Sequence, residues 1–410
     1  MAVQYLIGLD LGSSSIKAAV AEIKGDNRVS LVSLLKMPSE GIRRGVVDDF
    51  IDTTHAVSNV LAELKKISRN VSKHIVLSVG TPDIKVQNSK GVVAVSRADD
   101  EIYQDDIQRV IKSSQAISIP ANRMILHALT KEYIVDGIDG IKDPLGMIGK
   151  RLEVNSVIVD TFAPNIKNLV KCVETLGANV DACTLSSIAS ASSVLTKNQK
   201  ELGVVLIDIG AQKTSVAVYE EGNLIHAAVI PVGASNVTND LAIGLRIPTD
   251  AAETIKLSFG SAMNKEVSAR DTVDLSKVDS RAHGSVSKRF IAGIIEDRLA
   301  EIFELVNNEI KKVDKESQLP AGAVIVGGGA KTPYIAELAR QELKLPAQIG
   351  MADISLLPAE NGQVSILAED PEFTTAIGLL LNESTNTGSK TEPSKPVNQT
   401  IKRILNYFIP

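Results

Sequence analysis

The sequence predicts an α/β fold in which two duplicated domains face a common cleft. Three observations lead to this prediction: two similar hairpins, each with an acid followed two residues later by glycine, and one strand that runs through a glycine-rich turn into a helix. The chain has 410 residues, of which 44% are apolar, so it is long enough to form two or more domains with well-packed interiors.

The first hairpin, YLIGLDLGSSSIKAAVAEIKG, begins at Tyr5 and places polar residues between two apolar strands. These residues are Asp10, Gly12, Ser13, Ser14, Ser15 and Lys17. A tight turn points backbone N–H groups inward and forms a nest for anions such as phosphate. The serines add short hydroxyl donors, and Lys17 adds a point charge for a terminal phosphate.

A second hairpin, GVVLIDIGAQKTSVAVYEEGNL, repeats this pattern in the other half of the chain. When Asp208 is placed over Asp10, Gly210 falls on Gly12, and Thr214 supplies a hydroxyl near the turn. The repeat indicates duplicated domains. The two aspartates, one from each half, can hold water ligands of a Mg²⁺ ion that bridges phosphates.

The third signal is AVIVGGGAKTPYIAELARQEL, a strand followed by a glycine-rich turn and a helix that starts near Pro333. The turn consists of Gly327, Gly328, Gly329 and Ala330. Glycines let the backbone approach a flat ligand and free N–H groups for it. One such loop alone is better explained as an ordinary polar turn, but the ordered set of three favours a nucleotide site. The sequence has neither a P-loop nor a G-x-G-x-x-G motif.

Composition excludes several other classes. Aromatic residues make up 3% of the chain, tryptophan is absent and the net charge is −5, which argues against a general nucleic-acid binder. The two cysteines, Cys172 and Cys183, fit no metal spacing and suit a reducing cytosol. No apolar segment approaches the ~20 residues that span a bilayer, so we expect a cytoplasmic protein unless another feature ties it to a membrane.

The order of the three loops resembles the actin-like ATPase superfamily, and longer stretches resemble its FtsA family of cell-division proteins. These stretches include GIRRGVVDDF (41–50), IPVGASNVTNDLAIGLRIPTDAAETIK (230–256) and IIEDRLAEIFELVNNEI (294–310). The resemblance implies an actin-like (ribonuclease H-like) two-domain fold with an extra subdomain inserted in domain I and a flexible C-terminal tail. It also implies an ATP- and Mg²⁺-binding protein that polymerises at the inner membrane face and tethers FtsZ filaments there.

The pattern and the resemblance together give the expected domain boundaries. These are 1–83 and 163–202 for the core of domain I, 84–162 for the inserted self-assembly subdomain, 203–236 and 313–381 for the core of domain II, 237–312 for its small FtsZ-facing lobe, 382–396 for a linker and 397–410 for a terminal helix.

The resemblance extends the set of expected nucleotide contacts. Glu253 and Lys256 lie at helical i,i+3 spacing, which fits either a surface ion pair or the superfamily's pair beside the nucleotide sugar. The full expected set is Asp10, Gly12, Ser13, Ser14, Ser15, Lys17, Asp208, Gly210, Gln212, Lys213, Thr214, Glu253, Lys256, Gly327, Gly328, Gly329 and Ala330, with Asp10 and Asp208 also holding Mg²⁺ through water.

Two departures from the family pattern affect the expected chemistry. In the family the second phosphate loop is usually glycine-rich. Here it contains Ala211, Gln212 and Lys213, whose side chains leave phosphate less room to approach the backbone, and Lys213 adds a charge. Hydrolytic members often place an acid or amide between the halves, whereas TLSSIASA (184–191) has only hydroxyls. We therefore expect ATP binding with weak or absent turnover, and no catalytic residue is assigned.

The end of the chain predicts a membrane contact. Residues 382–396 form a polar linker, and VNQTIKRILNYFIP follows it. On a helical wheel one apolar face is shared by Val397, Ile401, Ile404, Leu405 and Phe408, and the basic residues Lys402 and Arg403 lie away from it. Such a helix is too short to span a bilayer but suited to lie in its interface. The alternative is a helix that docks on its own domain.

The expected partners follow from the resemblance: the FtsZ C-terminal peptide, further copies of this chain in filaments, inner-membrane lipid and other divisome proteins, at the division site. Basic residues that could meet the peptide's carboxylates, or simply form a solvated helix face, are Arg281, Lys288, Arg289 and Arg298. The alternative functions are a PilM-like pilus assembly scaffold, which shares the fold, and a small-molecule kinase of the superfamily, which would need a catalytic acid in a substrate cleft.

Overall fold

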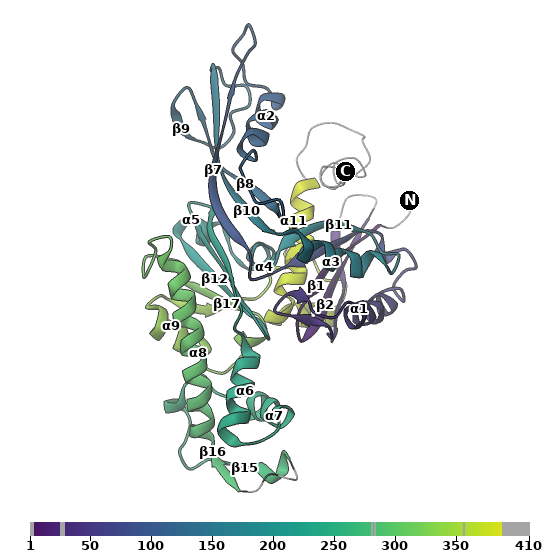
Figure 1. Ribbon diagram of the computed structural model, residues 1–410, viewed down its shortest axis with the longest axis vertical. Coiled ribbons are helices and arrows are strands. Elements are labelled where there is room, and N and C mark those ends of the chain that lie inside the picture. The colour runs from purple at the N-terminus through teal and green to yellow at the C-terminus, as the bar shows by residue number, and fades with distance from the viewer. Residues whose placement is uncertain (1–3, 25–28, 280–281, 283, 356, 388–410) are drawn as a thin grey trace.

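A computed structural model of the chain describes residues 4–24, 29–279, 282, 284–355 and 357–387. Figure 1 shows an elongated molecule with two central sheets, a subdomain at one end and a small helical lobe at the other. Both central sheets are mixed, and they confirm the expected actin-like, two-domain α/β fold.

The first central sheet has the strand order β11-β6-β1-β2-β3. Its strands are β1 (Gln4–Leu11), β2 (Ser15–Ile23), β3 (Val29–Pro38), β6 (Ile75–Val79) and β11 (Val180–Leu185). The hairpin strands β1, β2 and β3 are antiparallel, whereas β6 and β11 run parallel to β1. Helices α1 (Phe50–Leu64) and α3 (Ala163–Glu174) bury their apolar faces against one side of this sheet. Helix α1 begins where the Asp49 carboxylate accepts the N–H groups of Ile51 and Asp52.

The second central sheet repeats the first, with the order β14-β13-β12-β17-β18. Its strands are β12 (Val204–Ile209), β13 (Thr214–Glu220), β14 (Asn223–Ile230), β17 (Ala323–Val326) and β18 (Ala347–Ile349). Three antiparallel strands again precede two parallel ones, which is the duplication that the two hairpins predict. Helices α8 (Lys288–Lys311) and α9 (Ile335–Leu343) pack on this sheet in one large core.

The last described helix, α11 (Thr374–Thr387), returns to the first sheet. It packs on β1, β2 and α4 (Ser186–Val194), and its Ala376, Ile377 and Leu380 share a core with Ala19 and Leu31. Helix α10 (Gly362–Ala368) contributes to the same core. The sequence assigns all of 313–381 to domain II. In the structure this range divides, because the apolar face of α11 is buried by domain I.

The inserted subdomain is a separate antiparallel sheet with one helix, in the order β7-β10-β8-β9. Its elements are β7 (Lys85–Ala94), α2 (Gln104–Ser114), β8 (Arg123–Val135), β9 (Ile138–Ile141) and β10 (Arg151–Phe162). It has its own small core, which includes Ile102, Val110 and Leu152. This arrangement explains why the segment reads as a mixture of short strands and an amphipathic helix.

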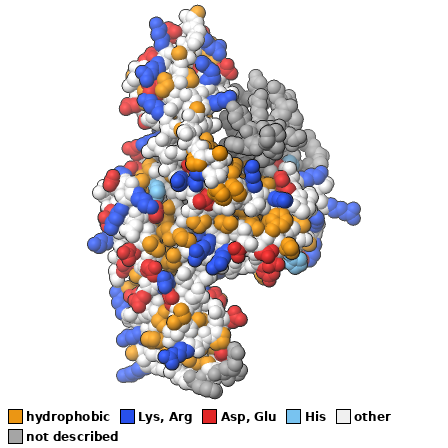
Figure 2. All heavy atoms as spheres, viewed as in Figure 1, with side chains coloured by type: hydrophobic (Ala, Val, Ile, Leu, Met, Phe, Trp, Pro, Cys, Tyr) orange, Lys and Arg blue, Asp and Glu red, His pale blue; other side chains and the backbone are white. Residues whose placement is uncertain are grey.

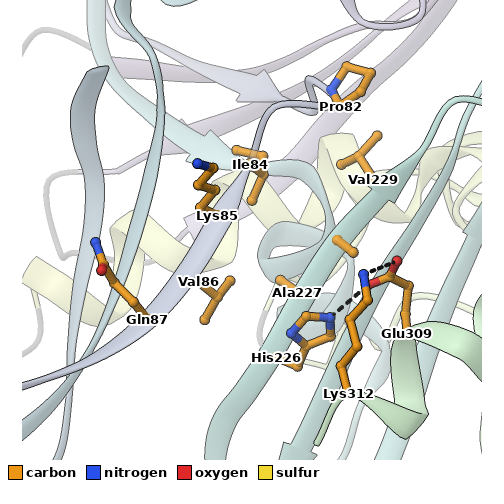
Figure 3. A pocket seen from close by; sticks show the side chains of 11 residues that line it. Pro82, Ile84, Lys85, Val86, Gln87, His226, Ala227, Val229, Glu309 and Lys312 are labelled. Carbon is orange, nitrogen blue, oxygen red and sulfur yellow. Dashed lines mark hydrogen bonds and ion pairs between the residues drawn. The ribbon is translucent and has the colours of Figure 1, made fainter. Parts of the chain in front are cut away.

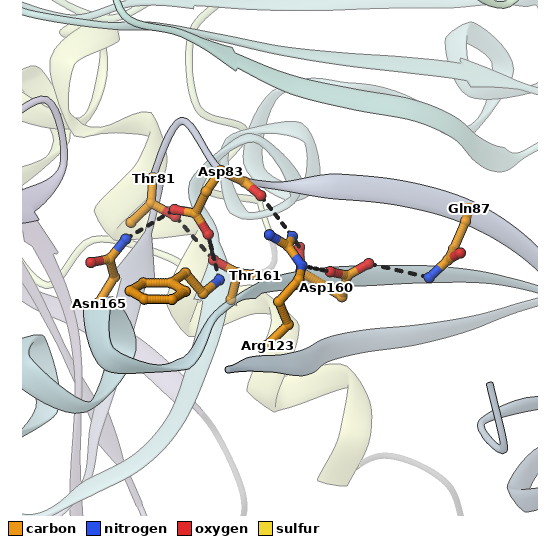
Figure 4. Close-up of polar contacts among 8 residues, drawn as sticks. Thr81, Asp83, Gln87, Arg123, Asp160, Thr161 and Asn165 are labelled. Carbon is orange, nitrogen blue, oxygen red and sulfur yellow. Dashed lines mark hydrogen bonds and ion pairs between the residues drawn. The ribbon is translucent and has the colours of Figure 1, made fainter. Parts of the chain in front are cut away.

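A buried polar network fixes the base of this subdomain (Figure 4). Arg123 pairs with the carboxylate of Asp160 and donates a 2.7 Å hydrogen bond to the Asp83 carbonyl oxygen. The Asp83 carboxylate accepts hydrogen bonds from Thr161 Oγ1 (2.8 Å) and Asn165 Nδ2 (3.0 Å). Because Asp83 precedes β7 and Asn165 lies on α3, the network joins the insertion to domain I.

On its other side the insertion meets domain II. Strand β7 lies against the edge strand β14, and a cavity of about 370 Å³ remains between them and the end of α8 (Figure 3). Within it, His226 Nε2 lies 3.0 Å from Glu309 Oε2, and Lys312 Nζ donates to the same carboxylate at 2.7 Å. The hydrogen bond from His226 is the main cause that lowers the pKa of Glu309.

The small lobe of domain II holds α6 (Ala234–Leu245), α7 (Thr249–Phe259), β15 (Thr272–Asp274), β16 (Ser285–Ser287) and the start of α8. Arg298 on α8 forms a bidentate pair with Asp240 on α6, at 2.5 and 3.0 Å, which joins the two helices.

The remaining short elements are β4 (Ile42–Arg43), β5 (Val46–Val47) and α5 (Lys197–Leu202). Among the described residues, no helix is both long and apolar enough to cross a membrane. Residues 397–410 and Arg281 lie outside the described part of the chain.

Candidate nucleotide site

Both acid hairpins and the glycine-rich loop converge on one cavity, of about 60 Å³, between the central sheets. Twelve of the residues expected from the sequence line it: Asp10, Gly12, Ser13, Ser14, Ser15, Lys17, Asp208, Gly210, Gln212, Lys213, Gly327 and Gly328. The other expected residues, Thr214, Glu253, Lys256, Gly329 and Ala330, lie outside its lining. Five further residues line it that are not in the expected set: Ala211, Ser186, Ser215, Glu372 and Thr375.

The first hairpin brings a carboxylate and a lysine ammonium group together. Asp10 and Lys17 are cross-strand partners, and Lys17 Nζ lies 3.8 Å from Asp10 Oδ2. Ser78 Oγ donates a 2.5 Å hydrogen bond to the other carboxylate oxygen. The hydroxyl of Ser13 is buried and has no hydrogen-bond partner among the described residues. A buried unpaired hydroxyl at the turn fits a phosphate oxygen, which would satisfy it.

The second hairpin places its acid deeper in the protein. Thr375 Oγ1 donates to Asp208 Oδ2 at 3.3 Å. Burial raises the pKa of Asp208, and the nearby charge of Asp10 raises it further, whereas Lys213 and Lys17 oppose the shift. The two carboxylates are therefore close enough to repel each other, which is the arrangement that a shared cation relieves.

The hydroxyl that faces the cavity on this hairpin belongs to Ser215, not Thr214. Strand residues alternate between faces, and the register pairs Asp208 with Ser215 and Ile209 with Thr214. Thr214 is fully buried, and its hydroxyl donates to the Val232 carbonyl oxygen at 2.8 Å. Of these two hydroxyl residues, Ser215 lines the cavity, whereas the predicted Thr214 does not.

The side chains of the second loop reach across to domain I. Lys213 Nζ donates a 2.8 Å hydrogen bond to the Gly80 carbonyl oxygen, and Gln212 Oε1 accepts one of 3.1 Å from the Arg44 N–H. Burial lowers the pKa of Lys213, while the charges of Asp10 and Asp208 oppose that shift. The departure from a glycine-rich loop thus places an additional cation inside the cleft.

The glycine-rich loop packs directly on β12. Gly327 has φ +83°, and a Cβ there would lie 2.3 Å from Asp208 Oδ1. A Cβ at Gly329 would lie 2.4 Å from Ile209 Cγ2. Gly327 and Gly329 therefore have to be glycine for the loop to lie this close to β12. Gly327 and its neighbour Gly328 also line the cavity. Helix α9 begins at Ile335, close to the predicted start near Pro333.

Glu253 and Lys256 form the ion pair that their spacing predicts, at 2.7 Å. Lys256 Nζ also donates to Thr238 Oγ1 (2.9 Å) and to the Ala234 carbonyl oxygen (3.3 Å). The N–H of Ala234 in turn donates to the Gly210 carbonyl oxygen. The pair is therefore connected to the second phosphate loop through α6, although it does not line the cavity.

Glu372 adds an acid that no sequence motif indicates. Its carboxylate lies 2.5 Å from Lys36 Nζ and 3.1 Å from Lys331 Nζ. Burial acts to raise its pKa, but the hydrogen bonds from the two lysines outweigh burial and lower it. Lys36 belongs to domain I and Lys331 to the glycine-rich loop, so Glu372 bridges the two halves of the cleft.

The arrangement suits phosphate groups and a hydrated cation. Its lining offers short hydroxyls, two lysine side chains and a pair of aspartates from opposite domains, beside two tight hairpin turns. Within the described residues, no cluster of three or more acidic, histidine or cysteine side chains could hold a metal by itself. A cation here would thus take most of its ligands from water and phosphate.

The two duplicated mixed sheets, with a cavity between them, define a protein of the actin-like class. A solved PilM–PilN type IV pilus biogenesis complex is similar with a TM-score of 0.65 at 15% identity, covering 92% of this chain and 98% of that one. MreB5 of Spiroplasma citri bound to ADP is similar with a TM-score of 0.53 at 14% identity, covering 94% and 99%. At these identities the likeness concerns the fold alone.

Sequence comparisons narrow the class. The family model for cell division protein FtsA matches residues 205–378, and that for the SHS2 domain inserted in FtsA matches 82–160. FtsA of Pseudomonas aeruginosa is 34% identical over 98% of this chain and 97% of its own length. FtsA of Bacillus subtilis is 32% identical, covering 92% and 83%. The chain belongs to the FtsA family of cell division proteins, which confirms the resemblance seen in its motifs and sets aside a pilus scaffold or small-molecule kinase.

Proposed function

We propose that this chain binds ATP with Mg²⁺ between its two domains, assembles into filaments on the cytoplasmic face of the cell membrane and tethers FtsZ filaments there. The observation that supports the proposal most directly is the convergence of both acid hairpins and the glycine-rich loop on one cavity. In a protein of the FtsA family, such a site would couple nucleotide to assembly at the division site.

At the nucleotide site, the first turn and the Ser13 hydroxyl would bind phosphate oxygens, and Lys17 would face the terminal phosphate. Asp10 and Asp208 would hold Mg²⁺ through water, and the ion would neutralise phosphate charge. The stretch 184–191 contributes Ser186 to the cavity, a hydroxyl and not an acid or amide that could orient water. We therefore propose ATP binding with weak or absent turnover.

For the FtsZ peptide, a hollow on the small lobe is the best-supported site. It has a volume of about 440 Å³ and is lined by Asn264, Ser287, Arg289, Phe290, Gly293, Ile294 and Asp297. Hydrophobic and basic side chains lie next to each other on this lobe (Figure 2). An exposed aromatic ring beside an arginine suits a short peptide with apolar and acidic residues.

Three of the four basic residues expected from the sequence lie in the described part of the chain, and their surroundings differ. Arg289 lines the hollow and uses Nε to bond the Val267 carbonyl oxygen. The guanidinium of Arg298 is held by Asp240 and Glu301, so its charge is already neutralised. Lys288 lies 4.0 Å from Asp271. We therefore assign the peptide's carboxylates to Arg289.

Self-assembly is supported by apolar side chains that the inserted subdomain exposes, namely Ile138, Leu145 and Ile148. Exposed apolar residues near one end of an elongated molecule suit contacts with a neighbouring copy.

Assembly would also strengthen membrane binding. Burying five apolar side chains of the tail in the membrane would contribute a favourable free energy of ~1.5–3 kcal/mol each. The conformational entropy lost on ordering some twelve residues, at ~1–2 kcal/mol each, would largely offset it. One tail therefore binds weakly, and many tails on one filament bind by avidity.

Co-sedimentation with anionic liposomes tests the proposal, with and without FtsZ. The full chain should carry FtsZ down with the liposomes, whereas Ile404→Glu or removal of residues 397–410 should leave both proteins in the supernatant. Asn406→Glu, which adds the same charge on the polar face of the helix, is the matched control and should retain most binding. ATP binding should be unchanged in all three variants. Liposome binding that survives the truncation would contradict the anchor.

A further inference from the structure

Lys213 is the most unusual residue of the candidate site, because it places a cation where a glycine-rich loop is expected. Its side chain leaves the turn between β12 and β13, enters the cleft and ends 2.8 Å from the Gly80 carbonyl oxygen of domain I. It lines the same cavity as Asp10 and Asp208 and interacts electrostatically with both. The Lys213 side chain therefore belongs to the site and reaches from domain II to domain I.

Two glycines of domain I make room for this side chain. A Cβ at Gly80 would lie 2.0 Å from Lys213 Nζ, and a Cβ at Gly45 would lie 3.3 Å from it. Gly45 also has φ +80°, a conformation that side chains disfavour. A residue of domain II thus fits a cradle built by domain I, which an accidental surface lysine would not require.

The charged residues that line the cavity are two lysines, Lys17 and Lys213, and three acids, Asp10, Asp208 and Glu372. Glu372 is paired with Lys36 and Lys331, so the two lysines of the lining face the two aspartates. A triphosphate adds negative charge and normally needs a divalent cation to offset it. Here an ammonium is already held between the two domains, where surrounding protein strengthens its attraction for phosphate.

We propose that Lys213 supplies the terminal phosphates with much of the positive charge that Mg²⁺ otherwise supplies, so that ATP binds to this chain with little dependence on Mg²⁺. The inference rests on the proposed function, because it concerns the same ATP site. It does not exclude Mg²⁺ from the site. It states that affinity for ATP is retained when the ion is removed.

Calorimetric titration of the full chain with ATP, in excess Mg²⁺ and in EDTA, tests the inference. For the unmodified protein we expect the two dissociation constants to agree within about threefold. For Lys213→Met, which keeps the aliphatic stem and removes the charge, we expect the loss of affinity in EDTA to exceed any loss in Mg²⁺ by about tenfold or more. Lys66→Met, at an exposed lysine just after α1, is the matched control and should behave like the unmodified protein.

A second variant tests the cradle independently of the lysine. Gly80→Ala would place a methyl group 2.0 Å from Lys213 Nζ and displace the ammonium, so it should acquire the same sensitivity to EDTA. If the unmodified protein loses ATP affinity in EDTA as strongly as Lys213→Met, or if Lys213→Met stays insensitive, the inference is wrong while the ATP site stands. If the unmodified protein binds no ATP even with Mg²⁺, the proposed nucleotide function itself fails.

Discussion

Asp10 and Lys17 face each other across the hairpin between β1 and β2, and their charged groups lie 3.8 Å apart. The acid is also bonded by Ser78, so both ends of its carboxylate are engaged. The lysine held in this way lies beside the turn of the hairpin, because a Cβ at Gly12 would be 3.8 Å from its Nζ. The relationship explains why an otherwise apolar hairpin contains one acid and one base at the same level.

Lys17→Ala should weaken ATP binding more than ADP binding, because the lost charge faces the terminal phosphate. We expect the dissociation constant for ATP to rise about tenfold or more, as for other desolvated charge contacts. Lys24→Ala, at the exposed end of the same hairpin, is the control. Calorimetry with both nucleotides measures the difference, and an equal loss for ATP and ADP would place Lys17 away from the terminal phosphate.

The sequence predicts much of the lining of this cavity, because the information is local. Each acid hairpin is a short motif in which the acid, the glycine and the hydroxyls are close together along the chain. Duplication then indicates that two such loops face each other. The choice between Thr214 and Ser215 needs the strand register as well. The pairing of Asp208 with Ser215 settles it, and the sequence alone does not give that pairing.

Residues that come from distant segments could not be predicted in the same way. Glu372 and Thr375 reach the cavity because α11 returns to domain I, and Glu372 is positioned by Lys36 and Lys331. Nothing in the local sequence near Glu372 distinguishes it from a solvated acid. The path of α11 is decided by which sheet buries its apolar face, and both sheets offer similar apolar strands.

Charge reversal at Arg289 should weaken binding of the FtsZ C-terminal peptide and should have little effect on folding. Arg289→Glu changes a residue that lines the hollow on the small lobe, and we expect at least about a tenfold loss of peptide affinity by fluorescence anisotropy. Arg298→Glu, by contrast, should mainly destabilise the lobe, because it places three acids together where Asp240 and Glu301 now hold a cation. Unchanged peptide affinity in a folded Arg289→Glu protein would show that Arg289 does not bind the carboxylates of the peptide.

The pair of His74 and Asp181 should make stability depend on pH. His74 Nδ1 lies 2.7 Å from Asp181 Oδ2, and this hydrogen bond raises the pKa of His74 above its ordinary value although burial opposes it. The folded state then binds the proton more tightly than the unfolded state. The contribution is therefore complete at pH values below the unfolded pKa and is lost as pH rises through the raised folded pKa.

Chemical denaturation at a series of pH values between about 5.5 and 8.5 measures this effect. The difference in free energy of unfolding between the unmodified protein and Asp181→Asn should be larger at the acidic end and should shrink toward the alkaline end. His55→Gln, at an exposed histidine of α1, is the control for histidine titration in general. A difference that is constant across the range would show that the pair does not titrate in this way.

The contact between α4 and α11 should tolerate no added methyl group at Gly378. A Cβ there would lie 1.8 Å from the Ala189 carbonyl oxygen, and the helices are also joined by the 2.7 Å hydrogen bond between Ser190 and Thr375. Gly378→Ala should lower the free energy of unfolding by about 1–3 kcal/mol or more. Thr375 on the same helix also donates to Asp208, so displacement of α11 should weaken ATP binding as well.

Gly362→Ala provides the matched control for this substitution. It adds the same methyl group at the start of α10, where no atom lies within 4 Å of the new Cβ. Alanine is the better helix former, so stability should be unchanged or rise by up to ~1 kcal/mol. Thermal and denaturant unfolding of both variants, followed by ATP titration, separate packing from intrinsic helix preference. If Gly378→Ala were as stable as Gly362→Ala and bound ATP normally, the close packing of α11 on α4 would not be what positions Thr375 at the nucleotide site.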